Sequence, residues 1–244
     1  MRVKSAEQAL ANIPLNWKPS NPEFLTVKES NLHRKFREAI SNKNNPDFSS
    51  LILEESKFVY SFDFLDEAYY LLIEDEIFNF LSVTRNSGIA LRADKFKFQE
   101  AVNLMWSTYA ELIVRYLYPK LNSEFKIHSK LMTYRLTTNE DWPKHVDGDV
   151  LSIITNFSKN FEGTDLRLYN YKDKDNNNTQ CDFVDYKDQI GRAIILPGNI
   201  KHAVTPLTKG QRLSLVIKVN RNENNERSNI MNVNDRNNYD YSFK

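Results

Sequence analysis

Cysteine and glycine are scarce in this 244-residue sequence, which contains one cysteine, Cys181, and six glycines. A single cysteine excludes an internal disulfide bond, so we expect a reducing compartment and a cytoplasmic location. No apolar run reaches the roughly 18 residues that a membrane-spanning helix needs, so we expect no membrane span. Residues 1–14 lack the apolar stretch that is typical of a signal peptide.

An excess of charge of either sign is also absent. The chain has 33 Lys and Arg residues against 32 Asp and Glu residues, for a formal net charge of +1. A near-neutral chain lacks the basic surface that is typical of general nucleic-acid or membrane binding, so we expect neither partner. The length suits one large domain that can bury a core without disulfide bonds. No feature of the sequence indicates an oligomeric state.

The chain divides into three parts by its patterning. We predict an irregular and helical support region over residues 1–120, a β-rich core over residues 121–220 and a polar, mobile tail over residues 221–244. Within the support region, residues 1–60 carry four prolines and a weak periodicity. One short helix is predicted there, near residues 31–41.

Two longer helices are predicted where apolar residues recur at spacings of three and four. The first covers about residues 65–81, with Ser61 or Asp63 as its N-cap. The second covers about residues 94–118 and stops before a proline. Apolar stripes of this kind predict packing against a sheet.

From Lys126 onward the apolar period becomes two, which is the pattern of strands. We predict strands over residues 126–136, 150–157, 165–169, 193–196 and 213–219. Five of the six glycines fall between or beside these strands, which is typical of the turns in an antiparallel barrel or sandwich. The polar residues 171–180 are predicted to form a surface loop.

Three residues are candidate metal ligands. His145 and Asp147 are two apart, so on a strand both side chains point to the same face, and folding could bring His202 beside them. Two imidazoles and one carboxylate form the facial triad of non-haem Fe(II) oxygenases, which leaves positions open for a chelating co-substrate and O₂. A His-x-Asp pair alone also fits a surface turn. We exclude His128, which is predicted to be a half-buried strand residue.

Arg212 and Ser214 are candidates for anion binding. Both would lie on one face of the last predicted strand, with Leu213 and Leu215 on the other face. If the first face looks into a barrel, Arg212 needs an anionic partner, because an unpaired buried charge is unfavourable. A ligand carboxylate suits the guanidinium fork. A structural Asp or Glu would also serve, but beside the triad we favour the ligand.

Together these motifs resemble the Fe(II)/2-oxoglutarate-dependent oxygenases, most closely the prolyl-hydroxylase-like branch. The resemblance covers roughly residues 126–220. It rests on His145-Val146-Asp147, on Arg212-Leu213-Ser214 and on the segments at residues 161–166, 191–197 and 202–210. Residues 1–120 match no family.

The resemblance implies a mainly β fold with a helical layer: a double-stranded β-helix, or jelly roll, with the N-terminal helices packed outside. It implies that His145, Asp147 and His202 bind Fe(II). It also implies that Arg212 pairs with the distal carboxylate of 2-oxoglutarate.

Three further residues match positions that contact the co-substrate in many members of this family. Tyr134 and Ser214 are expected beside the same distal carboxylate, and Asn156 is expected to face the co-substrate. Trp142, Asp149 and Arg167 are candidates for the substrate pocket by their proximity to the site or its strands. A hydrophobic cover would explain Trp142 equally well, and solvated positions would explain the other two.

The activity that the resemblance implies is oxygenation with Fe(II), 2-oxoglutarate and O₂, with succinate and CO₂ as co-products. Related halogenating enzymes have a small residue at the position of Asp147, so we expect hydroxylation. We expect a small polar substrate such as an amino acid or a related metabolite, because helices over residues 61–118 could close the pocket. The alternatives are a peptidyl, prolyl-type hydroxylase acting on a protein and a non-catalytic metal- or ligand-binding barrel.

Overall fold

The computed structural model describes residues 17–42, 44–84, 90–96, 98–121, 124–136, 142–169 and 183–222. The predicted loop at residues 171–180 and the predicted tail from residue 223 onward lie outside these ranges. None of the described helices is both long and apolar enough to cross a bilayer.

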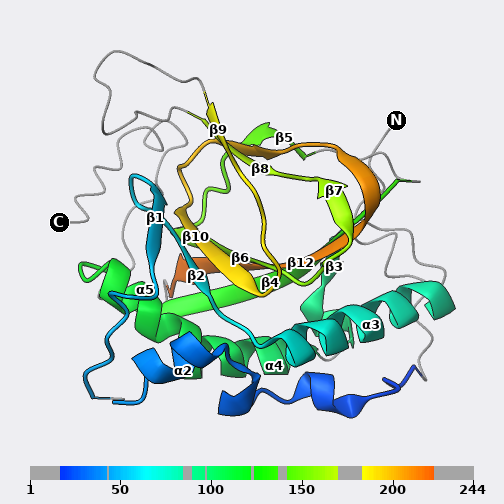
Figure 1. The fold of residues 1–244 in the computed structure, drawn as a ribbon, viewed down its shortest axis with the longest axis horizontal. Coiled ribbons are helices and arrows are strands. Elements are labelled where there is room, and N and C mark those ends of the chain that lie inside the picture. Colours follow the sequence, from blue (N-terminus) through cyan, green and yellow to red (C-terminus); the bar gives the residue numbers. More distant parts are fainter. Residues whose placement is uncertain are drawn as a thin grey trace.

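Helical segments form one layer of the molecule (Figure 1). In chain order they are η1 (Pro22–Leu25), η2 (Glu29–Asn31), α2 (Arg34–Ala39), α3 (Glu67–Thr84), η3 (Ala93–Phe96), α4 (Phe98–Met105), the π-helical turn η4 (Trp106–Ala110) and α5 (Glu111–Leu117). The short helix predicted near residues 31–41 is confirmed as α2. The helix predicted over residues 94–118 is interrupted, because a 3-10 segment precedes α4 and η4 separates α4 from α5.

The predicted start of the first long helix is wrong. Helix α3 begins at Glu67, and Asp66 caps it by accepting a hydrogen bond from the backbone N–H of Ala68 at 3.1 Å. Ser61 and Asp63, the predicted caps, belong to a strand instead.

In the described parts of the chain, twelve strands form two antiparallel sheets. The larger sheet contains β1 (Leu53–Ser56), β2 (Val59–Asp63), β3 (Ala90–Arg92), β4 (Phe125–Arg135), β6 (Leu151–Asn156), β7 (Phe161–Gly163), β10 (Arg192–Pro197) and β12 (Leu207–Arg221). Its order is β1-β2-β10-β6-β12-β4-β3, and β7 pairs with the start of β12. The smaller sheet contains β5 (Trp142–His145), β8 (Leu166–Tyr169), β9 (Phe183–Tyr186) and β11 (His202–Val204), in the order β5-β11-β8-β9.

All five predicted strands are confirmed, as β4, β6, β8, β10 and β12. Strands β1 and β2 were not predicted, because residues 1–60 were expected to be irregular. From β4 onward the chain passes repeatedly between the sheets: β4, β6, β7, β10 and β12 lie in the larger sheet, and β5, β8, β9 and β11 lie in the smaller one. The two sheets therefore face each other, and a small apolar cluster fills part of the space between them: Val59, Leu166, Leu168, Tyr186, Ile194 and Leu196.

The larger sheet separates the helical layer from the space between the sheets (Figure 1). On β12, the side chains of Leu213, Leu215, Ile217 and Val219 pack into the main core with the helices. Arg212 and Ser214 face the other way, as predicted. The expectation that the helices over residues 61–118 close the pocket is therefore wrong, because they cover the opposite face of the sheet.

Candidate metal centre and the cavity beside it

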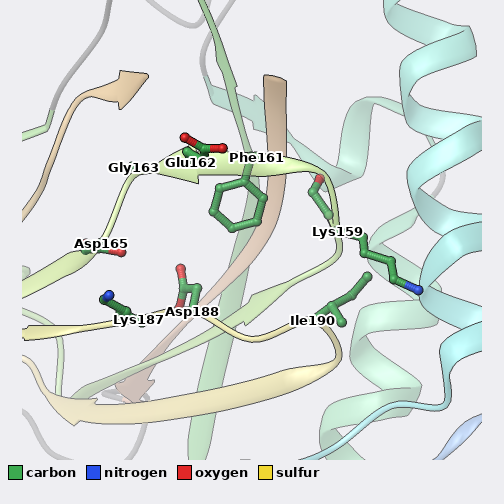
Figure 2. Close-up of a pocket in the computed structure, with 9 residues that line it drawn as sticks. Lys159, Phe161, Glu162, Gly163, Asp165, Lys187, Asp188 and Ile190 are labelled. Atoms are coloured by element: carbon green, nitrogen blue, oxygen red, sulfur yellow. The ribbon is translucent and has the colours of Figure 1, made fainter. Parts of the chain in front are cut away.

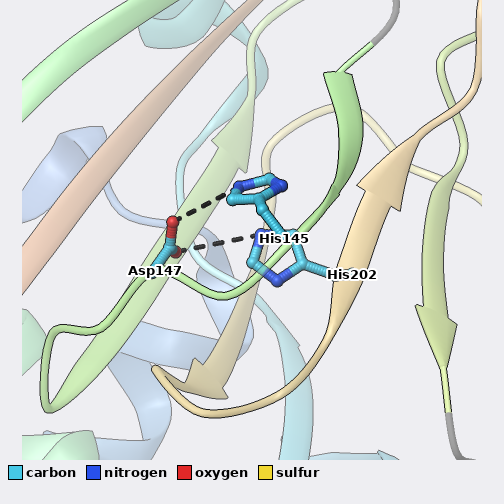
Figure 3. Close-up of side chains that lie close together, drawn as sticks. All are labelled: His145, Asp147 and His202. Carbon is cyan, nitrogen blue, oxygen red and sulfur yellow. Dashed lines mark ion pairs between the residues drawn. The ribbon is translucent and has the colours of Figure 1, made fainter. Parts of the chain in front are cut away.

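His145 and His202 are brought together by the pairing of β5 with β11. They are direct register partners in this strand pair, and their ring centroids are 4.3 Å apart. Asp147 follows β5 and turns its carboxylate toward both rings (Figure 3). The Nε2 atom of His145 lies 3.6 Å from Oδ1 of Asp147, and Nε2 of His202 lies 3.9 Å from Oδ2. The candidate ligand atoms of all three residues lie within 4.8 Å of one another.

Backbone carbonyls fix the orientation of both imidazole rings. The Nδ1 atom of His145 lies 2.8 Å from the carbonyl oxygen of Pro143, and Nδ1 of His202 lies 2.9 Å from that of Ile200. Because a carbonyl only accepts hydrogen bonds, each Nδ1 carries the proton. In the neutral form of each ring, Nε2 then presents a lone pair, which is the tautomer that binds a metal through Nε2.

Close packing holds the loop that carries Asp147. The backbone N–H of Gly148 donates to the carbonyl of Gly198 at 3.0 Å, and the N–H of Gly198 donates to that of Val150 at 3.1 Å. A Cβ atom at Gly198 would lie only 1.8 Å from the carbonyl oxygen of Asp149. Glycine at position 198 therefore lets the turn after β10 press against the loop and hold Asp147 near the histidines.

The Asp147 carboxylate has a protein donor at each oxygen. Ser152 donates to Oδ2 at 2.5 Å, and the Nζ of Lys218 lies 2.9 Å from Oδ1. Burial would raise the pKa of Asp147, but hydrogen bonds from His145, Lys218 and Ser152 outweigh burial and hold the pKa below its usual value. The carboxylate is therefore ionised, as a metal ligand must be.

The two histidines differ in their surroundings. Burial lowers the pKa of His202, against the opposing effects of the Ile200 carbonyl and of Asp147. For His145, the hydrogen bond to Asp147 raises the pKa, and burial opposes it. His202 is therefore the more strongly held in the neutral form that binds a metal.

A cavity of about 190 Å³ extends from this cluster into the space between the sheets. Its walls come mainly from the inward faces of β4, β6 and β12. Besides the triad, the lining residues include Lys130, Met132, Tyr134, Trp142, Ile154, Leu166, Val204, Arg212, Ser214, Val216 and Lys218. The structure thus brings together the three predicted metal ligands, Tyr134, Arg212, Ser214 and Trp142.

Trp142 lies against the cluster itself. Its indole N–H donates to Nε2 of His145 at 3.1 Å, and the two ring centroids are 6.0 Å apart. The indole thus binds the same nitrogen that is the candidate metal ligand. A metal at this position must take that lone pair from the tryptophan.

Arg212 lies deep in the structure and is only 2% exposed. Its Nη1 donates to the carbonyl of Thr164 at 3.1 Å, its Nη2 forms an ion pair with Asp188, and its Nε is buried without a hydrogen-bond partner. The ring of Tyr134, the register partner of Arg212, lies 5.2 Å from the guanidinium carbon. One part of this guanidinium thus remains open to a ligand.

Asp188 was not found from the sequence. It lies between β9 and β10, where no periodicity or motif marks it. Its side chain is 5% exposed. Burial raises the pKa of Asp188, and Arg212 opposes that shift. Arg212 therefore has an acidic partner within the chain, which is the alternative to a ligand that the sequence left open.

A second cavity, of about 400 Å³, has Asp188 in its wall (Figure 2). It is lined by Ser158, Lys159, Phe161, Glu162, Gly163, Asp165, Lys187, Asp188 and Ile190. We call it the outer cavity, and we call the cavity beside the triad the inner cavity.

Three other predicted residues do not line the inner cavity. Asn156 is opposite Ser214 in the sheet, but its carboxamide donates to the carbonyl of Ser158 at 2.9 Å and accepts from the N–H of Ser158 at 3.1 Å. Asp149 lies 2.9 Å from Lys218 and accepts a hydrogen bond from Asn220 at 2.8 Å. Both polar groups are thus bound by other residues of the chain.

Arg167 lies on the face of β8 that is opposite to Leu166, which lines the inner cavity. Its guanidinium forms two hydrogen bonds with Asp185, at 2.7 and 2.8 Å, and lies 3.9 Å from the ring centroid of Phe183. The structure therefore separates Arg167 from the site.

Fold and site together define a class: two facing antiparallel sheets that hold a His–Asp–His cluster, with a buried arginine along the same cavity. No protein-family model matches the sequence, and no curated protein matches it. Solved structures do. The chain is similar to a prolyl-4-hydroxylase from Pseudomonas putida, with a TM-score of 0.52, 13% identity and coverage of 84% of this chain and 99% of that one.

A second similar structure is that of prolyl 4-hydroxylases from Phytophthora capsici, with a TM-score of 0.52, 12% identity and coverage of 94% of this chain and 76% of that one. A 2OG-Fe(II) oxygenase family structure from Burkholderia pseudomallei gives a TM-score of 0.43 and 14% identity. That match covers 51% of this chain and 56% of the Burkholderia chain. The resemblance inferred from the sequence is thus confirmed at the level of the fold.

Proposed function

We propose that this chain is an Fe(II)/2-oxoglutarate-dependent oxygenase that hydroxylates a C–H bond of a small polar substrate. We also propose that the two sheets form a double-stranded β-helix, since the chain passes repeatedly between them from β4 to β12. The division into residues 1–120, 121–220 and 221–244 stays a prediction, although β1, β2 and β3 of the first part join the larger sheet. The cytoplasmic location also stays a prediction.

The triad is the observation that carries the proposal. His145 and His202 direct their Nε2 atoms toward the two oxygens of one ionised carboxylate, Asp147. Two neutral imidazoles and a carboxylate are the donor set of non-haem Fe(II) sites. Bound there, Fe(II) would supply the activation of O₂, with 2-oxoglutarate as the reductant that becomes succinate and CO₂.

The inner cavity fits the co-substrate in its charge pattern. Arg212 has a buried Nε without a partner, and its N–H can donate to one oxygen of a carboxylate ligand. Tyr134 and Ser214 line the same cavity and supply hydroxyl groups. We propose that these three residues hold the distal carboxylate. The co-substrate role of Asn156 stays a prediction, because Ser158 occupies its carboxamide.

The protein contributes orientation and a largely enclosed site. The carbonyls of Pro143 and Ile200 set the histidine tautomers, and Ser152 and Lys218 hold the ligating carboxylate. Apolar side chains between the triad and Arg212, such as Ile154 and Val216, line the cavity and exclude water. Trp142 covers the cluster on the side of His145.

Two other functions are supported by particular observations. A peptidyl, prolyl-type hydroxylase is favoured by the names of the two similar structures, which are prolyl 4-hydroxylases. A non-catalytic ligand-binding barrel is favoured by the Arg212–Asp188 ion pair, which gives the arginine a partner within the chain. Of the three substrate candidates, we retain Trp142, because Asp149 and Arg167 do not line the inner cavity and are paired with other residues of the chain.

A turnover assay tests the proposal. The purified protein is incubated with Fe(II), ascorbate, 2-oxoglutarate and pools of amino acids, small metabolites or proline-containing peptides, and His202→Ala serves as the control. We expect succinate, together with one free metabolite that gains one oxygen by mass spectrometry. An oxygenated peptide with unchanged metabolites would replace the small substrate with a peptide. Ligand binding without succinate in any pool would favour the non-catalytic barrel.

A further inference from the structure

The Arg212–Asp188 pair places a carboxylate of the protein where a ligand carboxylate is expected. Both side chains are buried, with 3% and 5% of their surfaces exposed. Of the nitrogens of Arg212, Nη2 contacts Asp188, Nη1 contacts the carbonyl of Thr164, and Nε is left over. A bidentate bond to an incoming carboxylate needs two neighbouring N–H groups, so one occupied nitrogen must be released.

The surroundings provide space for that release. Arg212 lines the inner cavity, whereas Asp188 lines the outer cavity, so the ion pair lies between the two. A carboxylate that leaves Arg212 can turn into the outer cavity, which is about 400 Å³ in volume. Lys187 lines that cavity and can offset the released negative charge, whereas Lys159 is paired with Glu67 and the lining acid Glu162 is paired with Lys209. Asp165 is a further acid in the lining.

We propose that Asp188 occupies the guanidinium of Arg212 in the free protein and that the distal carboxylate of the co-substrate binds in exchange for it. Asp188 is then a specificity-determining residue. It competes with the distal carboxylate of a dicarboxylate and not with a monocarboxylate, so it weakens the preference of the site for dicarboxylates. This inference rests on the proposed function, since it concerns the same co-substrate site.

The physical reason is repulsion between like charges. One guanidinium neutralises one carboxylate, and a second carboxylate beside it in a buried site is disfavoured unless the first one leaves. A 2-oxo acid of the same length without the distal carboxylate, 2-oxopentanoate, meets no such competition. The charge of Asp188 should therefore affect the binding of 2-oxoglutarate and leave that of 2-oxopentanoate unchanged.

Calorimetry tests this with both 2-oxo acids and the Mn(II)-loaded protein under anaerobic conditions. The variants are Asp188→Asn, which removes the charge at constant shape, and the control Glu162→Gln, which removes a charge from the outer cavity at a residue that pairs with Lys209. We expect Asp188→Asn to lower the Kd of 2-oxoglutarate by about tenfold or more, which lies in the range of coupling energies between close charges. The Kd of 2-oxopentanoate and all values for Glu162→Gln should equal those of the wild type.

Unchanged or weaker binding of 2-oxoglutarate by Asp188→Asn would overturn the inference and leave the proposed function standing. If neither acid binds the wild type or any variant, the proposed function fails and takes the inference with it. If Asp188→Asn does not fold, the wild type decides alone. A preference for 2-oxoglutarate below about tenfold supports the exchange, and a larger preference, as expected for an unoccupied buried arginine, contradicts it.

Discussion

His145 and His202 face each other across the β5–β11 pair, and the nitrogen of each ring that is not held by a backbone carbonyl points to a different oxygen of Asp147. The carbonyls of Pro143 and Ile200 orient the rings, and Ser152 and Lys218 hold the carboxylate. Little conformational entropy is therefore lost when these ligands bind a metal.

The first prediction concerns the metal ligands. His202→Ala and His145→Ala should each lose bound Fe(II), because two protein ligands rarely retain a metal that three hold. Succinate formation should fall to background in both variants, while the circular dichroism spectrum stays that of the wild type. Metal content by mass spectrometry is the direct readout. His128→Ala, outside the triad, is the matched control, and equal metal content in His202→Ala and His128→Ala would refute the assignment.

The second prediction uses Trp142 as a reporter of metal binding. Its N–H bond to Nε2 of His145 must break when a metal takes that nitrogen, and a paramagnetic ion will quench an indole at this distance. Titration with Mn(II) should therefore reduce the tryptophan fluorescence. The decrease should vanish in Trp142→Phe and persist in Trp106→Phe, whose indole lies in the core beside the helices. A decrease that survives in Trp142→Phe would place the metal elsewhere.

The third prediction concerns stability. Arg212→Met leaves the buried carboxylate of Asp188 without its cation, and breaking a buried ion pair in this way costs about 3–5 kcal/mol. Arg212→Met combined with Asp188→Leu removes both charges and should regain most of that loss. Urea denaturation gives the unfolding free energies. A double variant that is less stable than Arg212→Met alone would show that the two residues do not act as a pair.

The fourth prediction is a pH dependence at the alkaline end. Tyr118 is fully buried, its hydroxyl donates to the carbonyl of Phe58 at 2.7 Å, and burial raises its pKa well above the usual value. The pKa of Tyr118 in the folded state lies above its unfolded value of about 10. The protonated hydroxyl therefore makes its full contribution to stability below about pH 10, and this contribution is lost as the pH rises further.

Tyr118→Phe should therefore weaken the loss of stability above about pH 10. At neutral pH it should cost about 1 kcal/mol for the lost hydrogen bond. Thermal unfolding across pH 8–11.5 measures both effects, with Tyr116→Phe, whose residue is 46% exposed, as the control. Identical alkaline slopes for Tyr118→Phe and the wild type would contradict the expectation.

The local parts of this structure could be predicted from the sequence. On β12 the alternation of Leu213 and Leu215 with Arg212 and Ser214 is a property of the strand itself, and both faces were predicted correctly. The same holds for His145 and Asp147, whose spacing suggested a shared face. The place of His202 beside them depended on the family resemblance, because the register that joins β11 to β5 is a long-range contact.

The missing parts depend on contacts that no short window of sequence contains. Strand β1 was not predicted because it is short and its Leu53 is 55% exposed, so apolar alternation is hard to see there. Asp188 was missed because its significance comes from Arg212, which is distant in the sequence. Arg167 was assigned to the substrate pocket by closeness along the chain, but the pleat of β8 turns it away from the pocket.

Because β12 contributes to the helical core with one face and to the inner cavity with the other, its length is constrained more tightly than its composition. Deletion of a single residue within 212–216 would exchange the faces downstream of the deletion, placing Lys218 among leucines and Ile217 beside the metal ligands. Deletion of two residues would preserve the alternation but shift the register against β4 and β6. Over evolutionary time this strand can therefore accept conservative replacements far more readily than insertions or deletions.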